Sequence, residues 1–202
     1  MNSDWPIEFH TLPDIARAAP ISSRSPRMCF QWWAVKQAQG IVLSVGSETD
    51  PLGLERWAVH FDRQDLHEFF AKRNLPFVQG DAHQLDQYFP LASFDTVILG
   101  DILEHAEDPL KMLAAACNVA KRIVAATVWI ETRLPPGFTN NGEEGLTHRW
   151  NFTDDILGGI LEKLLSRFPG LKVSWWKVPE VMHEGTQFYE YLIRLEKCQE
   201  NR

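Results

Sequence analysis

The sequence lacks several features that define whole classes of protein. Its 202 residues include only three cysteines, Cys29, Cys117 and Cys198, and these lie far apart. Their spacing indicates neither a disulfide framework nor a Cys-x-x-Cys metal site; no other ligand cluster is evident, so we predict no metal. No apolar run approaches the roughly 20 residues of a membrane span, and the N-terminus has no signal-peptide pattern. These absences predict a cytoplasmic protein with no membrane partner.

Positive charge is also scarce. The chain has 20 Lys and Arg against 27 Asp and Glu, a formal net charge of −7. Because a nucleic-acid-binding face needs clustered basic residues to contact phosphates, we expect no nucleic-acid partner. The composition is otherwise that of a folded protein, with 45% hydrophobic residues, and the length suits one domain. We predict an irregular, proline-containing arm over residues 1–26 and a single domain over residues 27–202.

The order of the apolar segments predicts alternating strands and helices. Short runs rich in β-branched residues predict buried strands at 41–45, 57–61, 77–78, 96–99 and 123–129. Helices are predicted at 27–39, 64–73 and 108–121, and another helix, capped by Thr153, follows a long loop at 131–149. Two closing strands, 171–178 and 188–195, have no helix between them and predict an antiparallel hairpin. This order predicts an α/β fold with a doubly wound, mostly parallel sheet.

The most informative segment is S-F-D-T-V-I-L-G-D-I-L-E-H-A-E-D-P, residues 93–109. Its apolar run predicts a buried strand that stops at Gly100 and Asp101. A helix start follows, with Asp108 as the N-cap residue and Pro109 at the first helical position. Because ligands bind at the carboxyl ends of strands in parallel α/β sheets, the residues directly after this strand should line a crevice.

This segment closely resembles the fourth-strand segment of class I S-adenosylmethionine (SAM)-dependent methyltransferases, commonly S-F-D-x-V-x-x-x-D-V-L-E-H-x-x-D-P. The resemblance implies a Rossmann-like sheet of seven strands with an antiparallel terminal strand. It also implies SAM as the cofactor and S-adenosylhomocysteine as the product. By this resemblance, Gly100 packs against SAM and Asp101 lies near its methionine end and the acceptor. His105 is a candidate general base, and a structural role is its alternative.

Residues 42–51, V-L-S-V-G-S-E-T-D-P, resemble the family's first-strand turn V-L-D-V-G-x-G-x-G. The resemblance implies that Gly46 and Ser47 approach the methionine part of SAM. The family's second and third glycines permit the backbone to approach the ligand closely, and in this chain Glu48 and Asp50 replace them. The next strand follows after a short stretch, as in a compact subgroup whose first crossover helix is reduced to a turn. That subgroup is often linked to glycan or small-metabolite pathways, which implies a small-molecule or glycan-type acceptor.

The second and third strands end in residues that the resemblance assigns to the cofactor. Asp62 follows the second strand and would bind the ribose hydroxyls, since a charged acceptor makes the stronger hydrogen bond. The alternative is a loop residue that caps the next helix. Gly80-Asp81-Ala82 resembles the family's G-D-A turn: Asp81 would accept from the adenine amino group and Ala82 would offer its backbone N–H. A purely structural turn is the alternative here.

Residues 146–153, L-T-H-R-W-N-F-T, resemble the family's H-x-x-x-F-T segment before the penultimate helix. The functional interpretation places His148, Arg149 and Trp150 over the acceptor at the rim of the crevice. The alternative is a helix-entry motif, in which Thr153 is the N-cap and Phe152 a hydrophobic staple.

We therefore interpret the chain as a SAM-dependent methyltransferase that acts by in-line transfer, with Asp101, His105 and His148 as candidate catalytic residues. The rival hypothesis is a catalytically inactive partner protein with this fold, because Glu48 and Asp50 would repel the SAM carboxylate. A nucleotide-dependent dehydrogenase is excluded because no G-x-G-x-x-G follows the first strand. No feature predicts an oligomeric state.

Overall fold

The computed structural model describes residues 26–46, 53–54, 58–130, 136–138, 148–179 and 189–198. The predicted N-terminal arm, apart from Pro26, lies outside this set, as does Ser47. Within the described part of the chain, no helix is long and apolar enough to cross a membrane.

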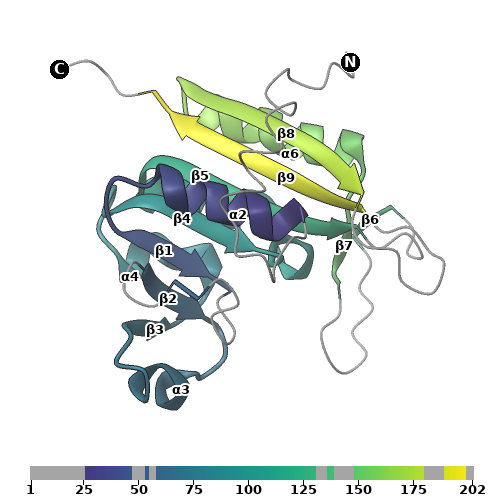
Figure 1. Ribbon diagram of the computed structural model, residues 1–202. Helices are drawn as coiled ribbons and strands as arrows, with labels where there is room; N and C mark the ends of the chain where they lie inside the picture. The colour runs from purple at the N-terminus through teal and green to yellow at the C-terminus, as the bar shows by residue number, and fades with distance from the viewer. Residues whose placement is uncertain are drawn as a thin grey trace.

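One seven-stranded sheet runs through the molecule in the order β3-β2-β1-β4-β5-β9-β8 (Figure 1). The strands are β1 (Val42–Val45), β2 (Ala58–Asp62), β3 (Phe77–Gln79), β4 (Phe94–Gly100), β5 (Ala120–Ile130), β8 (Leu171–Pro179) and β9 (Tyr189–Lys197). The first five are mutually parallel, whereas β9 is antiparallel to both of its neighbours, β5 and β8. The predicted doubly wound sheet with an antiparallel terminal strand is confirmed.

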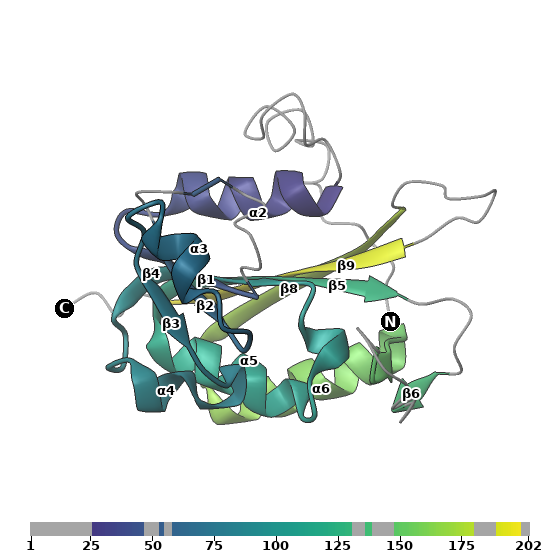
Figure 2. The ribbon, with the colours of Figure 1, turned by 90° about the horizontal axis from the view of Figure 1, so that it is seen from below.

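Helices cover both faces of this sheet. The α-helices are α2 (Pro26–Gln37), α3 (His67–Ala71), α4 (Leu85–Tyr88), α5 (Pro109–Val119) and α6 (Asp154–Arg167). Two short 3₁₀ helices, η2 (Ala82–Gln84) and η3 (Leu103–His105), follow β3 and β4. Figure 2 shows α2 on one face of the sheet and α5 and α6 on the other.

The helix starts follow the predicted capping. The Asp108 side chain accepts a hydrogen bond from Lys111 N at 2.9 Å, with Pro109 at the first position of α5. The Thr153 hydroxyl accepts from Ile156 N at 3.4 Å at the start of α6. Caps of this kind depend on residues three positions apart, so sequence reasoning can find them.

Several predicted boundaries are corrected. The helix expected at 64–73 is one short helix, α3, because its N-terminal residue Leu66 provides no side-chain cap. The segment expected to be a plain loop contains β6 (Gly137–Phe138), which pairs with β7 (Trp150–Asn151).

The connection between the first two strands is also visible. β1 ends at Val45 and β2 begins at Ala58, so the first crossover is as short as predicted. Asp62 is the last residue of β2 and not the first after it.

Candidate cofactor and acceptor site

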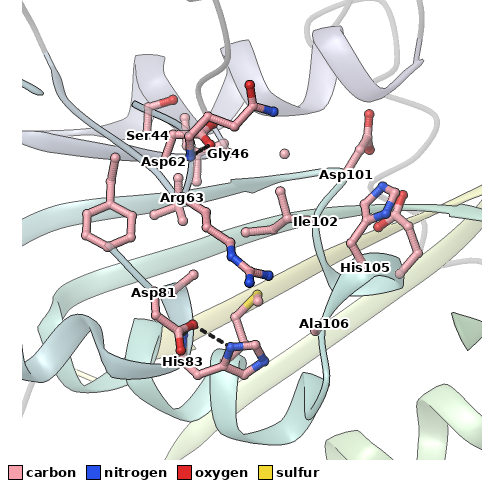
Figure 3. Close-up of a pocket in the computed structure, with 18 of the residues that line it drawn as sticks. Ser44, Gly46, Asp62, Arg63, Asp81, His83, Asp101, Ile102, His105 and Ala106 are labelled. Atoms are coloured by element: carbon pink, nitrogen blue, oxygen red, sulfur yellow. Dashed lines mark hydrogen bonds and ion pairs between the residues drawn. The ribbon is translucent and has the colours of Figure 1, made fainter. Parts of the chain in front are cut away.

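A cavity of about 670 Å³ opens at the carboxyl ends of the parallel strands (Figure 3). Its lining includes every described residue that the sequence analysis assigned to cofactor binding or catalysis: Gly46, Asp62, Gly80, Asp81, Ala82, Gly100, Asp101, His105 and His148. These residues come from the ends of four strands and from the segment before α6. The fold therefore gathers the predicted residues around one space.

The turn after β1 approaches the turn after β4 very closely at Gly46. Its φ angle is +74°, in the left-handed region that favours glycine. A Cβ atom at this position would overlap the Ile102 side chain and lie 3.2 Å from the Gly100 carbonyl oxygen. Glycine is therefore required here by both conformation and space, and it leaves backbone exposed to the cavity.

Asp62 places a buried carboxylate at the end of β2. The residue is only 8% exposed and lines the cavity. Its Oδ1 accepts a hydrogen bond from Gln64 N at 2.9 Å. This bond fixes the carboxylate at the cavity wall and stabilises the turn after β2. The alternative of a loop residue that caps the next helix is wrong, because the N-cap residue of α3 is Leu66.

Asp81 and His83 form a bonded pair at the third strand end. Asp81 Oδ1 accepts from His83 N at 2.9 Å, which caps η2, and lies 2.6 Å from His83 Nδ1. His83 Nε2 accepts from Asp108 N at 3.3 Å, so the imidazole proton belongs on Nδ1, where it is donated to Asp81. Burial acts to raise the pKa of Asp81, but the hydrogen bonds from His83 outweigh it and the pKa is lowered. Asp81 thus caps η2, and its role toward adenine stays a prediction.

Helix α2 contributes residues that sequence reasoning missed. Arg27 Nη1 forms an ion pair with Asp101 Oδ2, and the Thr127 hydroxyl donates to Asp101 Oδ1 at 2.6 Å. Gln31 Nε2 in turn donates to Thr127 Oγ1 at 2.8 Å. Arg27 and Gln31 both line the cavity. The Asp101 carboxylate is therefore held in place by a cation and a hydroxyl.

Glu104 is a fully buried carboxylate beside the cavity. Its Oε1 accepts from Trp129 N at 2.9 Å, whereas Oε2 has no hydrogen-bond partner among the described residues. Burial raises the pKa of Glu104 well above its usual value, and the nearby Asp101 carboxylate raises it further. The backbone oxygen of Glu104 accepts from Arg149 N at 2.7 Å, which ties η3 to the segment before β7.

That contact brings two histidines together. The rings of His105 and His148 lie 4.8 Å apart between centroids, at 66° to one another. One ligand atom from each of Glu104, His105 and His148 lies within 4.8 Å of the others. These three residues form a group of potential metal ligands that the spacing in the sequence does not reveal. His148 joins the cluster from a segment far along the chain, which no spacing rule would detect.

The family of this protein is known from comparison with other sequences. The family model described as "Methyltransferase domain" matches residues 51–185, about two thirds of the chain. The chain belongs to this methyltransferase family. The prediction of a class I SAM-dependent methyltransferase is confirmed, and SAM is the cofactor that membership of this family implies. A search of curated protein sequences finds no match.

Solved structures of methyltransferases share the fold. A SAM-dependent methyltransferase from Thermotoga maritima matches with a TM-score of 0.59 at 16% identity, covering 95% of each chain. One from Archaeoglobus fulgidus matches with a TM-score of 0.58 at 15% identity, over 94% of this chain and 99% of that one. Magnesium protoporphyrin IX methyltransferase from Synechocystis PCC 6803, with bound SAM, has a TM-score of 0.51 at 16% identity, over 82% and 75%. Such low identities establish a common fold and not a common acceptor.

Proposed function

We propose that this protein transfers a methyl group from SAM to a small-molecule or glycan-type acceptor. The observation that carries the proposal is the cavity itself, where the turns after β1, β2, β3 and β4 converge with Gly46, Asp62, Asp81 and Gly100 in its wall. A site of this kind at the carboxyl ends of parallel strands is where such sheets bind nucleotide-like ligands. Membership of the methyltransferase family supports the same activity.

The residues present suit SAM part by part. The backbone exposed at Gly46 admits the methionine part, because a side chain there would overlap Ile102. The buried Asp62 carboxylate suits the vicinal ribose hydroxyls, which are donors. Ala82 offers its backbone N–H to the adenine ring, beside Asp81. The Arg63 side chain also lines the cavity and reaches toward its centre in Figure 3, where its planar guanidinium suits stacking on adenine.

Bound SAM supplies an electrophilic methyl group, and the protein's own part is to place the acceptor in line and to exclude water. Asp101 is ion-paired with Arg27 and accepts from Thr127, so we assign it a positioning and electrostatic role. His105 and His148 remain as the groups that can receive a proton from an acceptor hydroxyl or ammonium. Both line the cavity.

The shape and lining of the cavity favour a small acceptor. Its volume of about 670 Å³ must hold both the cofactor and the acceptor group. The wall also includes Trp129, His105 and His148. An aromatic ring with two imidazoles suits a hydroxylated or ring-shaped group, such as a sugar unit.

Isothermal titration calorimetry with SAM and S-adenosylhomocysteine tests this proposal. We expect micromolar binding by the wild type and a loss of about 10- to 100-fold for Asp62→Ala, because charge-assisted hydrogen bonds contribute about 1.5–3 kcal/mol. Asp155→Ala is the matched control, since Asp155 is an exposed carboxylate at the start of α6 that does not line the cavity.

Absence of heat and of a thermal shift at millimolar SAM would contradict the enzyme proposal. The chain would then be better explained as an inactive partner protein with a methyltransferase fold. Equal losses in Asp62→Ala and Asp155→Ala would place the cofactor elsewhere.

A further inference from the structure

We propose that Glu104, His105 and His148 bind a divalent transition-metal ion at the acceptor side of the cavity. Two of these residues belong to η3, directly after β4, and the third precedes β7. All three line the cavity. Two imidazoles and one carboxylate are a ligand set that proteins use for zinc and for other first-row divalent ions.

The distances suit a shared ion. Ligand atoms of the three side chains lie within 4.8 Å of one another, and the two imidazole rings approach to 4.8 Å between centroids. Metal–nitrogen and metal–oxygen bonds of about 2.0–2.2 Å would hold the three atoms about 3–4 Å apart. Small rotations of the half-buried histidine side chains are enough to close this difference.

The Glu104 carboxylate provides an independent indication of a ligand. It is fully buried, and in the part of the chain that the structure describes Oε2 has no hydrogen-bond partner. A buried carboxylate is costly unless it is paired or coordinates a metal. The other oxygen is fixed by Trp129 N, so Oε2 is held in a defined direction. Supporting hydrogen bonds of this kind commonly orient metal ligands.

The identity of the ligands selects the class of ion. Mg²⁺, Ca²⁺ and Mn²⁺ prefer oxygen ligands, whereas imidazole suits zinc, copper, iron and nickel. Three protein ligands leave at least one coordination position for another group, and all three residues line the cavity. The nearby Asp101 carboxylate adds favourable negative charge, although Arg27 partly compensates it.

The consequence for chemistry rests on the proposed function. An acceptor hydroxyl that binds at the open position becomes more acidic and loses its proton to solvent or to a base. The resulting oxygen attacks the SAM methyl carbon, a C–O bond forms, the C–S bond breaks, and the sulfur keeps the electron pair as S-adenosylhomocysteine. The ion neither gains nor loses electrons in this step.

Titration of the metal-free, untagged full chain with Co²⁺ tests the site, without SAM. We expect one ion per chain by calorimetry and a visible absorption band from low-symmetry Co²⁺, both removed by competing Zn²⁺. Glu104→Gln, His105→Ala and His148→Ala should each weaken Co²⁺ binding by at least about tenfold. His67→Ala is the matched control, because His67 is an exposed histidine on α3, outside the cluster, and should bind Co²⁺ as the wild type does.

The outcomes separate the two proposals. No heat and no absorption band with Co²⁺ would overturn the metal site, as would wild-type Co²⁺ binding by the double variant His105→Ala/His148→Ala. Circular dichroism and thermal unfolding identify any variant that does not fold. If the histidine variants do not fold, the isosteric Glu104→Gln variant tests the metal site. Co²⁺ binding in a protein that fails to bind SAM would support the ion site and contradict the methyltransferase proposal. SAM binding in a protein that fails to bind Co²⁺ would support the methyltransferase proposal and contradict the ion site.

Discussion

The two faces of the sheet are packed in different ways. On the face covered by α5 and α6, β5 presents Val124, Ala126 and Val128 to an apolar core that includes Leu113 of α5. On the face covered by α2, the alternate residues of β5 include Thr127, which accepts from Gln31. The α5 and α6 face therefore has one large apolar core, whereas the α2 face combines two smaller apolar clusters with a chain of polar bonds that reaches the cavity.

The large apolar core and the polar chain should therefore contribute differently to stability and to function. Apolar burial is non-directional and contributes mainly to the free energy of folding. Buried polar groups require specific partners, so their positions are fixed more sharply. The α2 face places Arg27, Gln31, Thr127 and Asp101 in one connected network beside the cofactor cavity. We expect substitutions on the two faces to affect different measurements.

The largest expected effect on stability is for Leu113→Ala on the α5 face. Leu113 is completely buried, and truncation of a buried leucine costs about 2–5 kcal/mol because a cavity remains. Urea denaturation should show this loss, while the SAM affinity of the folded fraction stays within about twofold. Leu165→Ala, at a partly exposed position of α6, is the control and should cost far less. A large loss of SAM affinity with Leu113→Ala would break the proposed separation.

Gln31→Leu should lower SAM affinity more clearly than stability, in contrast to Leu113→Ala. The substitution removes the hydrogen bond to Thr127 at little change in volume, so about 0.5–1.5 kcal/mol of stability should be lost. SAM affinity should fall more clearly, since the position of α2 against Gly100 and Asp101 depends on this network. A double-mutant cycle with Thr127→Val should show coupling of about 0.5–3 kcal/mol. Additive effects of the two substitutions would show that the bonds do not act as one network.

The smallest expected effect is a stabilisation by Gly158→Ala and Gly159→Ala. Helix α6 continues without interruption through both glycines, and a Cβ at either position would meet nothing within 4 Å. Alanine is favoured over glycine inside a helix by about 0.5–1 kcal/mol. Thermal unfolding should therefore show a higher midpoint for each variant, with unchanged SAM binding. A lower midpoint would indicate that the glycines serve a conformation other than this helix.

Much of the fold follows from local patterns in the sequence. The apolar run of β4, its stop at Gly100 and the caps at Asp108 and Thr153 depend on residues a few positions apart. For that reason the sheet could be predicted correctly from its strand ends and helix starts, together with the likeness to a known family. The prediction for 64–73 was less accurate because that helix has no side-chain cap, and the β6–β7 pair was missed because its strands have only two residues each.

The cavity shows where local patterns stop being sufficient. Asp62, Asp81 and Gly46 could be assigned from the sequence because each directly ends a strand or follows it, and parallel strands bring such positions to one edge. The roles of these residues toward SAM remain predictions. The bond between His83 and Asp108, by contrast, joins two turns whose proximity the sequence does not indicate.

The sequence by itself determined the order of strands and helices, the likeness to methyltransferases and the turns that surround the cofactor cavity, because burial, capping and glycine conformation act over a few residues. Only the tertiary structure decided that Arg27 neutralises Asp101 and that His148 joins Glu104 and His105. These contacts depend on which strands become neighbours and on how α2 and the segment before α6 pack against the sheet. That packing sums many weak contacts between distant residues, and no single motif encodes it.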